Sequence, residues 1–288
     1  MKCNECPRKC NIDRDEAVGF CGVGNKVRLA RAALHMWEEP IISGKEGSGT
    51  IFFSGCNLKC VFCQNYDIAH GFGKDVEIDR LCEIMAELEA KGANNINLVT
   101  PSHYVDQIIK ALDKYRPKVP IVYNSSGYES VDTLKKLEGY IDVYLPDLKY
   151  SDNALALKYS KCKDYFDIAT KAILEMKRQQ PKDVVVDGLM KKGIIVRHLV
   201  LPNGINNTLG VLGWIVDNMP KESYISLMGQ FTPFGEAKDY PELNRIIKPL
   251  EYKLAINKLV ENGFENAFIQ DIGSASESFI PPFNLEGV

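Results

Sequence analysis

Short apolar runs alternate with amphipathic stretches along most of the chain, and this alternation restricts the possible folds more than any other feature. The runs are rich in β-branched and aromatic residues and are bounded by polar residues, glycine or proline, which is typical of buried strands. Six such runs span residues 50–53, 95–99, 120–123, 142–145, 194–201 and 224–228. Between and after them, apolar residues recur at helical spacing in 78–88, 105–112 and 246–259.

Alternating strands and helices predict an α/β fold, because parallel neighbouring strands need a crossover connection. Six strand–helix units suggest an open or partial (β/α)6 barrel, whose functional residues gather at the C-terminal ends of the strands. The chain has 288 residues, 45% of them hydrophobic, which is enough for a large core. We assign residues 46–288 to the barrel and residues 1–45 to a cysteine-rich segment with its connector, which we place at 26–49.

Three cysteines follow the first predicted strand with the spacing C-x3-C-x2-C, at Cys56, Cys60 and Cys63. Thiolates are soft ligands that suit iron–sulfur clusters and zinc. A [4Fe–4S] cluster ordinarily has four protein ligands, and no fourth cysteine follows within this loop. The spacing therefore predicts a cluster with one iron open to an external ligand. The alternative is a zinc site with a distant fourth ligand.

A second cysteine group lies near the N-terminus, at Cys3, Cys6, Cys10 and Cys21. Four thiolates are able to hold a zinc or iron ion, or a second cluster, and we favour a single ion. Such a metal would supply folding energy that this short polar segment lacks. The total of nine cysteines is odd, which argues against a fully paired disulfide framework.

Composition and charge exclude several classes of protein. The net charge is −3 and no long basic tract occurs, so we expect no nucleic-acid partner. No apolar run reaches the 18 or so residues of a membrane span, and the polar start has no signal-peptide core. We therefore expect a cytoplasmic protein without a membrane partner.

The cysteine loop resembles the signature of the radical S-adenosylmethionine (SAM) superfamily. The stretch 49–56 and the following Cys63-Gln64-Asn65 are similar to relatives of pyruvate formate-lyase activating enzymes, and the similarity covers the N-terminal cysteines and nearly the whole barrel. The resemblance implies that the open iron chelates SAM and that an electron from reduced ferredoxin or flavodoxin cleaves it. The resulting 5′-deoxyadenosyl radical then abstracts hydrogen from a substrate.

In the subgroup the substrate is a glycine of a partner glycyl-radical enzyme. Two alternatives remain open. One is hydrogen abstraction from another peptide or from a small molecule. The other is a non-catalytic metal-binding or electron-transfer protein.

The resemblance also implies a set of residues near SAM. They are Phe62, Thr100, Asn124, Ser126, Asp147, Lys149, Arg197 and Gln230. The chain departs from the subgroup at Thr100, where a Gly-Gly-Glu stretch is usual, and at Gln230, where a histidine is usual. Lys149 is expected near the SAM carboxylate, because an ammonium stabilises a carboxylate in a poorly solvated pocket. The alternative for Asp147 and Lys149 is a surface ion pair.

Arg197 is expected to face the barrel interior, and its neighbour His198 to have a structural role. Successive side chains on a strand point to opposite faces, so the two cannot both enter the interior.

Overall fold

The computed structural model describes residues 2–270 and 281–288, and Met1 and residues 271–280 lie outside this description. Its strands are β1 (Val27–His35), β2 (Ser48–Phe53), β3 (Lys74–Val76), β4 (Ile96–Val99), β5 (Ile121–Ser125), β6 (Val143–Pro146), β7 (Val184–Val186), β8 (Leu189–Leu199), β9 (Tyr224–Met228) and β10 (Ala267–Ile269). All six predicted strands are confirmed, as β2, β4, β5, β6, β8 and β9.

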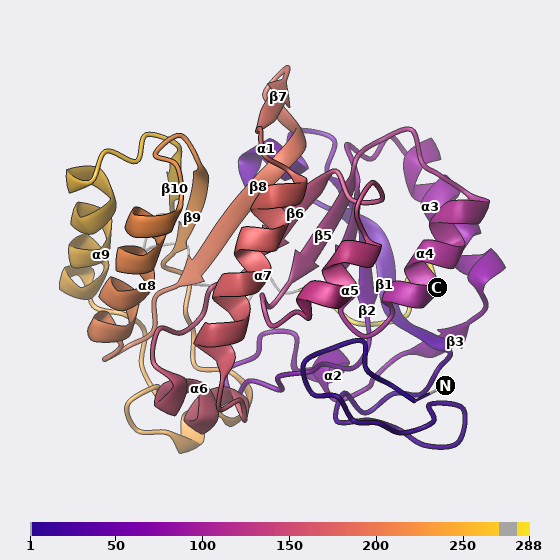
Figure 1. Cartoon of the computed structure of the whole chain (residues 1–288), viewed down its shortest axis with the longest axis horizontal. Helices are drawn as coiled ribbons and strands as arrows, with labels where there is room; N and C mark the ends of the chain where they lie inside the picture. The colour runs from indigo at the N-terminus through magenta and orange to yellow at the C-terminus, as the bar shows by residue number, and fades with distance from the viewer. Residues whose placement is uncertain (1, 271–280) are drawn as a thin grey trace.

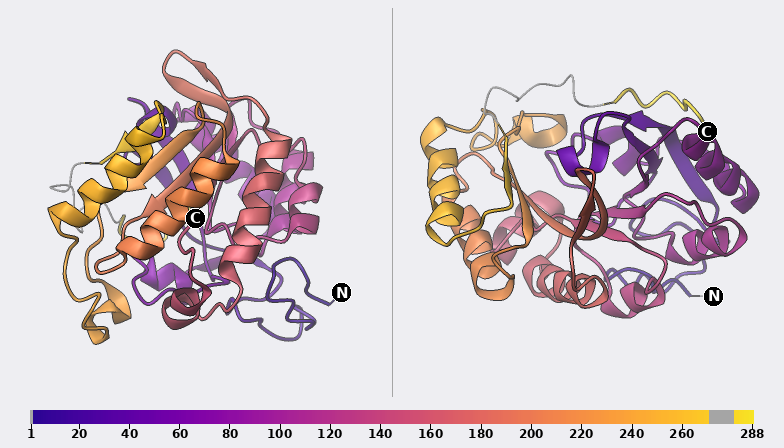
Figure 2. Two further views of the ribbon diagram at one scale, coloured as in Figure 1. Left: turned by 60° about the vertical axis from the view of Figure 1, so that its left-hand side comes forward. Right: turned by 90° about the horizontal axis from the view of Figure 1, so that it is seen from above.

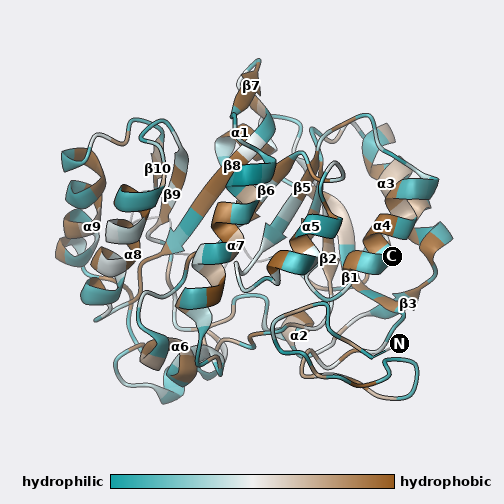
Figure 3. Ribbon diagram, viewed as in Figure 1, coloured by the Kyte–Doolittle hydropathy of each residue, from teal (hydrophilic) through white to brown (hydrophobic). Residues whose placement is uncertain are grey.

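Helices connect these strands. They are α1 (Pro40–Ser43), α2 (Tyr66–Ala69), α3 (Ile78–Ala90), α4 (Val105–Lys114), α5 (Val131–Lys136), α6 (Asn153–Ser160), α7 (Tyr165–Gln179), α8 (Ile205–Asn218), the 3-10 helix η1 (Gly235–Asp239) and α9 (Pro249–Glu261). The longer helices are amphipathic, and hydrophobic and hydrophilic residues alternate along the ribbons of α4 and α7 (Figure 3). None of the helices in the described ranges is long and apolar enough to cross a membrane.

The strands form one sheet in the order β10-β9-β8-β6-β5-β4-β2-β1-β3, and β7 forms an antiparallel hairpin with β8. Neighbours from β2 through to β10 run parallel. Seen from above, the sheet curves and the longer helices lie along its outer side (Figures 1 and 2). This is the predicted α/β fold with a parallel sheet, and the order leaves β3 and β10 as separate edges, so the barrel is open.

Residues 26–49 are not a connector, which corrects the prediction for this stretch. They contain β1, which pairs antiparallel with β2, with Leu34 opposite Gly49. Leu29 and Ala30 are fully buried, so β1 belongs to the core of the barrel. Near the C-terminus, the amide of Leu285 donates to the carbonyl of Ala30, which places the tail along the same strand.

Helix α1 covers the end of the barrel where the parallel strands begin. Its residue Ile42 is fully buried and packs against side chains of β5, β6 and β8. The side-chain amides of Asn94 and Asn95, just before β4, donate to the carbonyls of Ser43 and Ile42. In Figure 1, α1 lies at the top of the view, whereas α2 and α6 lie at the opposite end, where the parallel strands finish.

The last helix differs from its prediction. It begins at Pro249 instead of residue 246, and its buried face consists of Tyr252, Ala255 and Leu259. Leu250 and Leu254, two of the apolar residues that predicted the helix, are 66% and 43% exposed. Spacing alone cannot choose between two apolar stripes on one helix, and here the stripe with a large aromatic residue packs inward.

Candidate active site

A cavity of about 300 Å³ lies within the barrel and reaches the C-terminal ends of its strands. Its lining includes Cys56, Cys60 and Cys63, which lie between β2 and α2. It also includes every residue that the sequence predicts near SAM: Phe62, Thr100, Asn124, Ser126, Asp147, Lys149, Arg197 and Gln230. The fold thus gathers side chains from six separate strand ends and loops, although their individual contacts with SAM stay predictions.

The cysteine loop is held by backbone contacts to the N-terminal segment. Gly55 has a φ of +88°, and a Cβ there would lie 2.9 Å from the carbonyl oxygen of Cys21. Glycine is therefore required both by the left-handed backbone and by the close approach. The amide of Cys56 donates to that same carbonyl over 3.2 Å. Leu58 is fully buried, and its amide donates to Cys56 Sγ over 3.3 Å.

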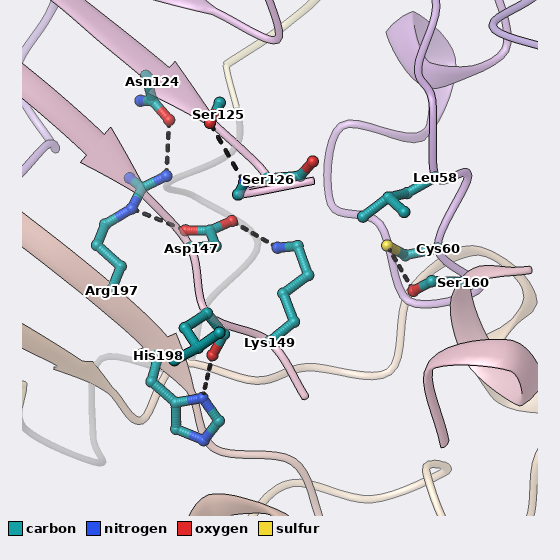
Figure 4. A network of polar contacts seen from close by, with 12 residues as sticks. Leu58, Cys60, Asn124, Ser125, Ser126, Asp147, Lys149, Ser160, Arg197 and His198 are labelled. Carbon is teal, nitrogen blue, oxygen red and sulfur yellow. Dashed lines mark hydrogen bonds and ion pairs between the residues drawn. The ribbon is translucent and has the colours of Figure 1, made fainter. Parts of the chain in front are cut away.

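Cys60 receives a hydrogen bond from outside its own loop. The Ser160 hydroxyl, at the end of α6, donates to Cys60 Sγ over 2.9 Å (Figure 4). Tyr150 Oη in turn lies 2.7 Å from Ser160 Oγ. Burial raises the pKa of Cys60 to about 11, and the Lys149 ammonium opposes this increase. Burial also raises the pKa of Cys63, and Lys149 again favours the thiolate. The Lys149 charge thus favours the thiolate form of two of the three cysteines.

The three thiols of this loop are of a type that suits a [4Fe–4S] cluster, whose ligands bind separate irons. In the described part of the chain, no three side chains of the histidine, cysteine, aspartate or glutamate type are placed to hold a single metal ion. Ligands of a cubane bind separate irons, so they lie farther apart than the ligands of one ion. No fourth cysteine is found among the described residues that line the cavity. The loop would hold three irons and leave the fourth without a protein ligand.

A row of ion pairs crosses the cavity wall next to this loop. Lys149 Nζ and Arg197 Nε lie 2.5 Å and 2.9 Å from the two carboxylate oxygens of Asp147, and Arg197 Nη2 donates to Asn124 Oδ1 over 2.7 Å (Figure 4). Although burial alone would raise it, Arg197 and Lys149 hold the pKa of Asp147 below its usual value. The Lys149 and Asp147 side chains are only 18% and 13% exposed, so the surface ion pair is excluded.

Gly127 allows two of these strand ends to approach each other. Its φ is +75°, and a Cβ at this position would collide with the carbonyl oxygen of Asp147. The Tyr165 hydroxyl bridges the same two loops, because it lies 2.7 Å from the carbonyl of Ser126 and 2.9 Å from that of Asp147. Ser126 Oγ is buried without a hydrogen-bond partner, which leaves it available to a ligand.

His198 points away from the cavity, as strand alternation predicts. Its ring nitrogens lie 2.7 Å from the carbonyl of Leu148 and 2.9 Å from Thr208 Oγ1, and the residue is fully buried (Figure 4). Burial lowers the pKa of His198 to about 4, so the ring is neutral at physiological pH. Its role is to join β8 to α8.

Two cavity residues, Glu38 and Glu39, were missed by the sequence analysis. They follow β1 in the stretch that was assigned to a connector. Glu38 Oε2 lies 3.3 Å from Arg197 Nη1, and the Asn97 amide donates to Glu38 Oε1 over 3.1 Å. The alternation of apolar side chains with Arg28 and Arg31 was the available signal for a strand here.

The N-terminal cysteines lie close together at the start of the chain. A Cβ on Gly19 would lie 3.3 Å from Cys10 Sγ and 3.7 Å from Cys21 Sγ. Burial raises the pKa of Cys6 to about 12, and the charges of Cys21 and Cys3 raise it further. No three of these thiols meet at a point where one ion would bind. A second metal therefore stays a prediction.

Comparison with known proteins gives the family. Residues 50–194 match the model of the Radical SAM superfamily. The uncharacterized protein MJ0674 of Methanocaldococcus jannaschii is 32% identical over 265 residues, which cover 88% of this chain and 73% of that protein.

Solved structures with a similar chain path include methylornithine synthase (PylB), with a TM-score of 0.49, 16% identity and coverage of 74% of this chain and 67% of that one. Another is anSMEcpe with bound AdoMet and a peptide, with a TM-score of 0.48, 15% identity and coverage of 75% and 60%. On the family match and the MJ0674 alignment, this chain belongs to the radical SAM superfamily.

Proposed function

We propose that this protein cleaves SAM reductively and directs the radical at a hydrogen of a substrate held in the barrel. The observation that supports this most strongly is the single cavity shared by Cys56, Cys60 and Cys63 and by all of the predicted SAM contacts. When bound, the [4Fe–4S] cluster and SAM supply a 5′-deoxyadenosyl radical that abstracts hydrogen.

The protein's own residues bind and orient the cofactor. Lys149 provides an ammonium beside the cysteine sulfurs, at a place where it is able to pair with the SAM carboxylate. Asp147 and Asn124 fix the position of Arg197, which lies deeper along the same wall. Ser126 offers a free hydroxyl, and Phe62 offers an aromatic surface to the adenine ring. Gln230 and Thr100 complete the lining and have no assigned partner atom on SAM.

The substrate proposal rests on the subgroup resemblance. It makes a glycine of a partner glycyl-radical enzyme the first candidate, with reduced ferredoxin or flavodoxin as the electron donor. Another peptide or a small molecule is the alternative. A cytoplasmic location suits a cluster held by thiolates, because reducing compartments keep thiols available for metal ligation.

Release of 5′-deoxyadenosine tests the proposed function. The protein is loaded anaerobically with iron and sulfide, reduced with dithionite and incubated with SAM. We expect release by the wild type and by Cys82→Ala, because Cys82 lies on α3 and contacts the Ala111 carbonyl outside the cavity. Cys60→Ala should release none. Equal release by wild type and Cys60→Ala, or none by either, would favour the non-catalytic alternative.

Deuterium transfer identifies the substrate. Candidate partners are labelled at glycine Cα, or at another carbon for small molecules, and mass spectrometry follows the label into 5′-deoxyadenosine. Transfer from a glycyl-radical enzyme would establish the first candidate. Transfer only from another peptide or a small molecule would replace it.

A further inference from the structure

The cavity continues away from the cysteine loop, toward the end of the barrel that α1 covers. Ser226 on β9 is the register partner of Arg197 on β8 and lies two positions before the end of its strand. Glu39 comes immediately before α1, at the end of the barrel where the parallel strands begin, and its side chain approaches Arg197 from that end. Asp147 pairs with Arg197 and so lies at this level, and Lys149 follows it by two positions toward the cysteine loop.

Negative charge exceeds positive charge in this cavity. Among the described lining residues the carboxylates are Glu38, Glu39 and Asp147, and the cations are Lys149 and Arg197. His35 adds no charge, because burial lowers its pKa to about 4.

Pairing leaves Glu39 as the surplus carboxylate. Asp147 binds Lys149 and Arg197, and Glu38 binds Arg197 and two asparagine amides. The only ion pair of Glu39 with a described cation is a long approach to Arg197, 3.9 Å from Nη1 to Oε2, and the Ser226 hydroxyl also faces its carboxylate. A buried carboxylate with so weak a partner is costly unless a ligand completes its interactions.

Acceptor atoms without hydrogen-bond partners line this part of the cavity, from the level of Ser226 to that of Gln270, two positions nearer the strand ends. Glu39 Oε2, Ser226 Oγ and Gln270 Oε1 are all buried and unpaired, and all three residues line the cavity. Glu39 is 7% exposed and Ser226 is 1% exposed. The Ser226 hydroxyl lies close enough to lower the pKa of Glu39, while burial raises it. Gln270 follows Phe268, the register partner of Ser226, by two positions and so presents its side chain on the same face of the sheet.

We propose that Glu39, Ser226 and Gln270 bind a cationic nitrogen of the substrate, as an alkylammonium group. A primary ammonium carries three N–H donors and one positive charge, which matches three unpaired acceptors and one surplus carboxylate. This proposal rests on the proposed function, since it names the substrate class of the same cavity. The ammonium belongs either to a small amine or to a lysine side chain of a peptide.

Matched ligand pairs test the proposal by isothermal titration calorimetry on cluster-loaded protein with SAM and without reductant. The small pair is n-butylammonium and n-butanol. The peptide pair is acetyl-Gly-Lys-Gly-amide and acetyl-Gly-norleucine-Gly-amide. We expect the charged member of at least one pair to bind about tenfold more tightly than its neutral counterpart, and the pair that shows this identifies the source.

Variants locate the binding. Glu39→Gln should remove the preference for the charged ligand, and Ser226→Ala should weaken it several-fold. Glu83→Gln, which removes one exposed carboxylate on α3, should leave it unchanged. If Glu39→Gln fails to fold, Ser226→Ala and Gln270→Ala test the proposal instead, and each should weaken the preference for the charged ligand.

Equal binding of charged and neutral members in both pairs would overturn the proposal, as would an unchanged preference in the cavity variants. The same samples, once reduced, report 5′-deoxyadenosine release. Release without ammonium binding would therefore reject this subsite and leave the proposed function intact.

Discussion

The two cysteine groups of this chain differ in what supports their sulfur atoms. In the loop of residues 56–63, Cys60 receives a hydroxyl from α6 and a nearby cation from the loop after β6. In the N-terminal segment, Cys10 receives its hydrogen bond from Phe20, within the same segment. The first group is therefore organised by the barrel, whereas the second depends on local contacts. A loop built into a rigid fold is suited to hold a reactive cofactor in place.

The two groups are nevertheless in direct contact. One contact is the hydrogen bond from the Cys56 amide to the Cys21 carbonyl. In addition, the Arg8 guanidinium donates to the carbonyl of Asn57 over 2.8 Å and to that of Lys161 over 2.7 Å. The same guanidinium lies 3.9 Å above the ring of Phe20. Arg8 therefore joins the N-terminal segment, the cysteine loop and the end of α6.

Removal of single cysteines should give the largest difference between the two groups in bound iron and zinc. Cys63→Ala should lower the iron–sulfur absorption at least about tenfold, because loss of even an outer-sphere partner costs metal sites that much affinity. Cys3→Ala and Cys10→Ala should keep this absorption and lose a separate portion of bound metal. Iron, zinc and sulfide analysis checks this. An unchanged metal content in both N-terminal variants would remove the second metal site.

Loss of the Arg8 contacts should have the next largest effect. Arg8→Ala should lower the free energy of unfolding by about 2 kcal/mol, since its bonds to the carbonyls of Asn57 and Lys161 are charge-assisted and partly exposed. Arg178→Ala is the control, because its ion pairs on α7 are half exposed and should contribute under about 1 kcal/mol. Urea denaturation measures both. Similar losses in the two variants would show that the N-terminal segment is not joined to the loop through Arg8.

Protonation of His103 at low pH should destabilise the folded chain where the N-terminal segment packs against the cysteine loop. Its Nε2 lies 2.8 Å from the Ser54 carbonyl, and Nδ1 is buried without a partner. Burial lowers the pKa of His103 to about 4, and Arg14 lowers it as well. In the unfolded chain the ring takes up a proton near pH 6.5, so the stability contributed by the neutral ring is present above that pH and is lost as the pH falls toward 4.

The wild type should thus lose about 2 kcal/mol more than His103→Gln between pH 7 and pH 5. Urea denaturation at the two pH values gives the difference. Parallel pH profiles for wild type and variant would contradict this assignment.

Removal of the hydroxyl that reaches Cys60 should have the smallest effect. The Ser160 bond stabilises the more negative, reduced cluster, so Ser160→Ala should lower the midpoint potential. A tenfold change in the ratio of reduced to oxidised cluster corresponds to about 59 mV. Redox titration followed by electron paramagnetic resonance measures it, with Ser160→Thr as the hydroxyl-retaining control. A higher potential in Ser160→Ala, or the same shift in both variants, would contradict the role of this bond.

Much of the barrel could be predicted because its strands are buried on both faces and read as apolar runs. The cysteine loop could be predicted because its three ligands come from one short stretch with fixed spacing. Cavity residues that follow strand ends, such as Asp147 and Lys149, were found by the same rule. Their ion pairs could not be predicted, because the pairing with Arg197 depends on how β6 and β8 meet in space.

Glu38 and Glu39 show where sequence reasoning was insufficient. The preceding stretch, which forms β1, contains alanines and arginines at spacings that fit neither a regular strand nor a regular helix. It forms a strand because it pairs with β2. Their approach to Arg197 joins parts of the chain more than 150 residues apart, which no local pattern encodes.

Mössbauer spectroscopy of protein loaded with 57Fe tests the central claim most directly, because it distinguishes the four irons of one cluster. Addition of SAM should change the isomer shift of a single iron and leave the other three as they were. A spectrum that does not respond to SAM, or a loop that binds zinc in place of iron, would contradict an open corner held by Cys56, Cys60 and Cys63.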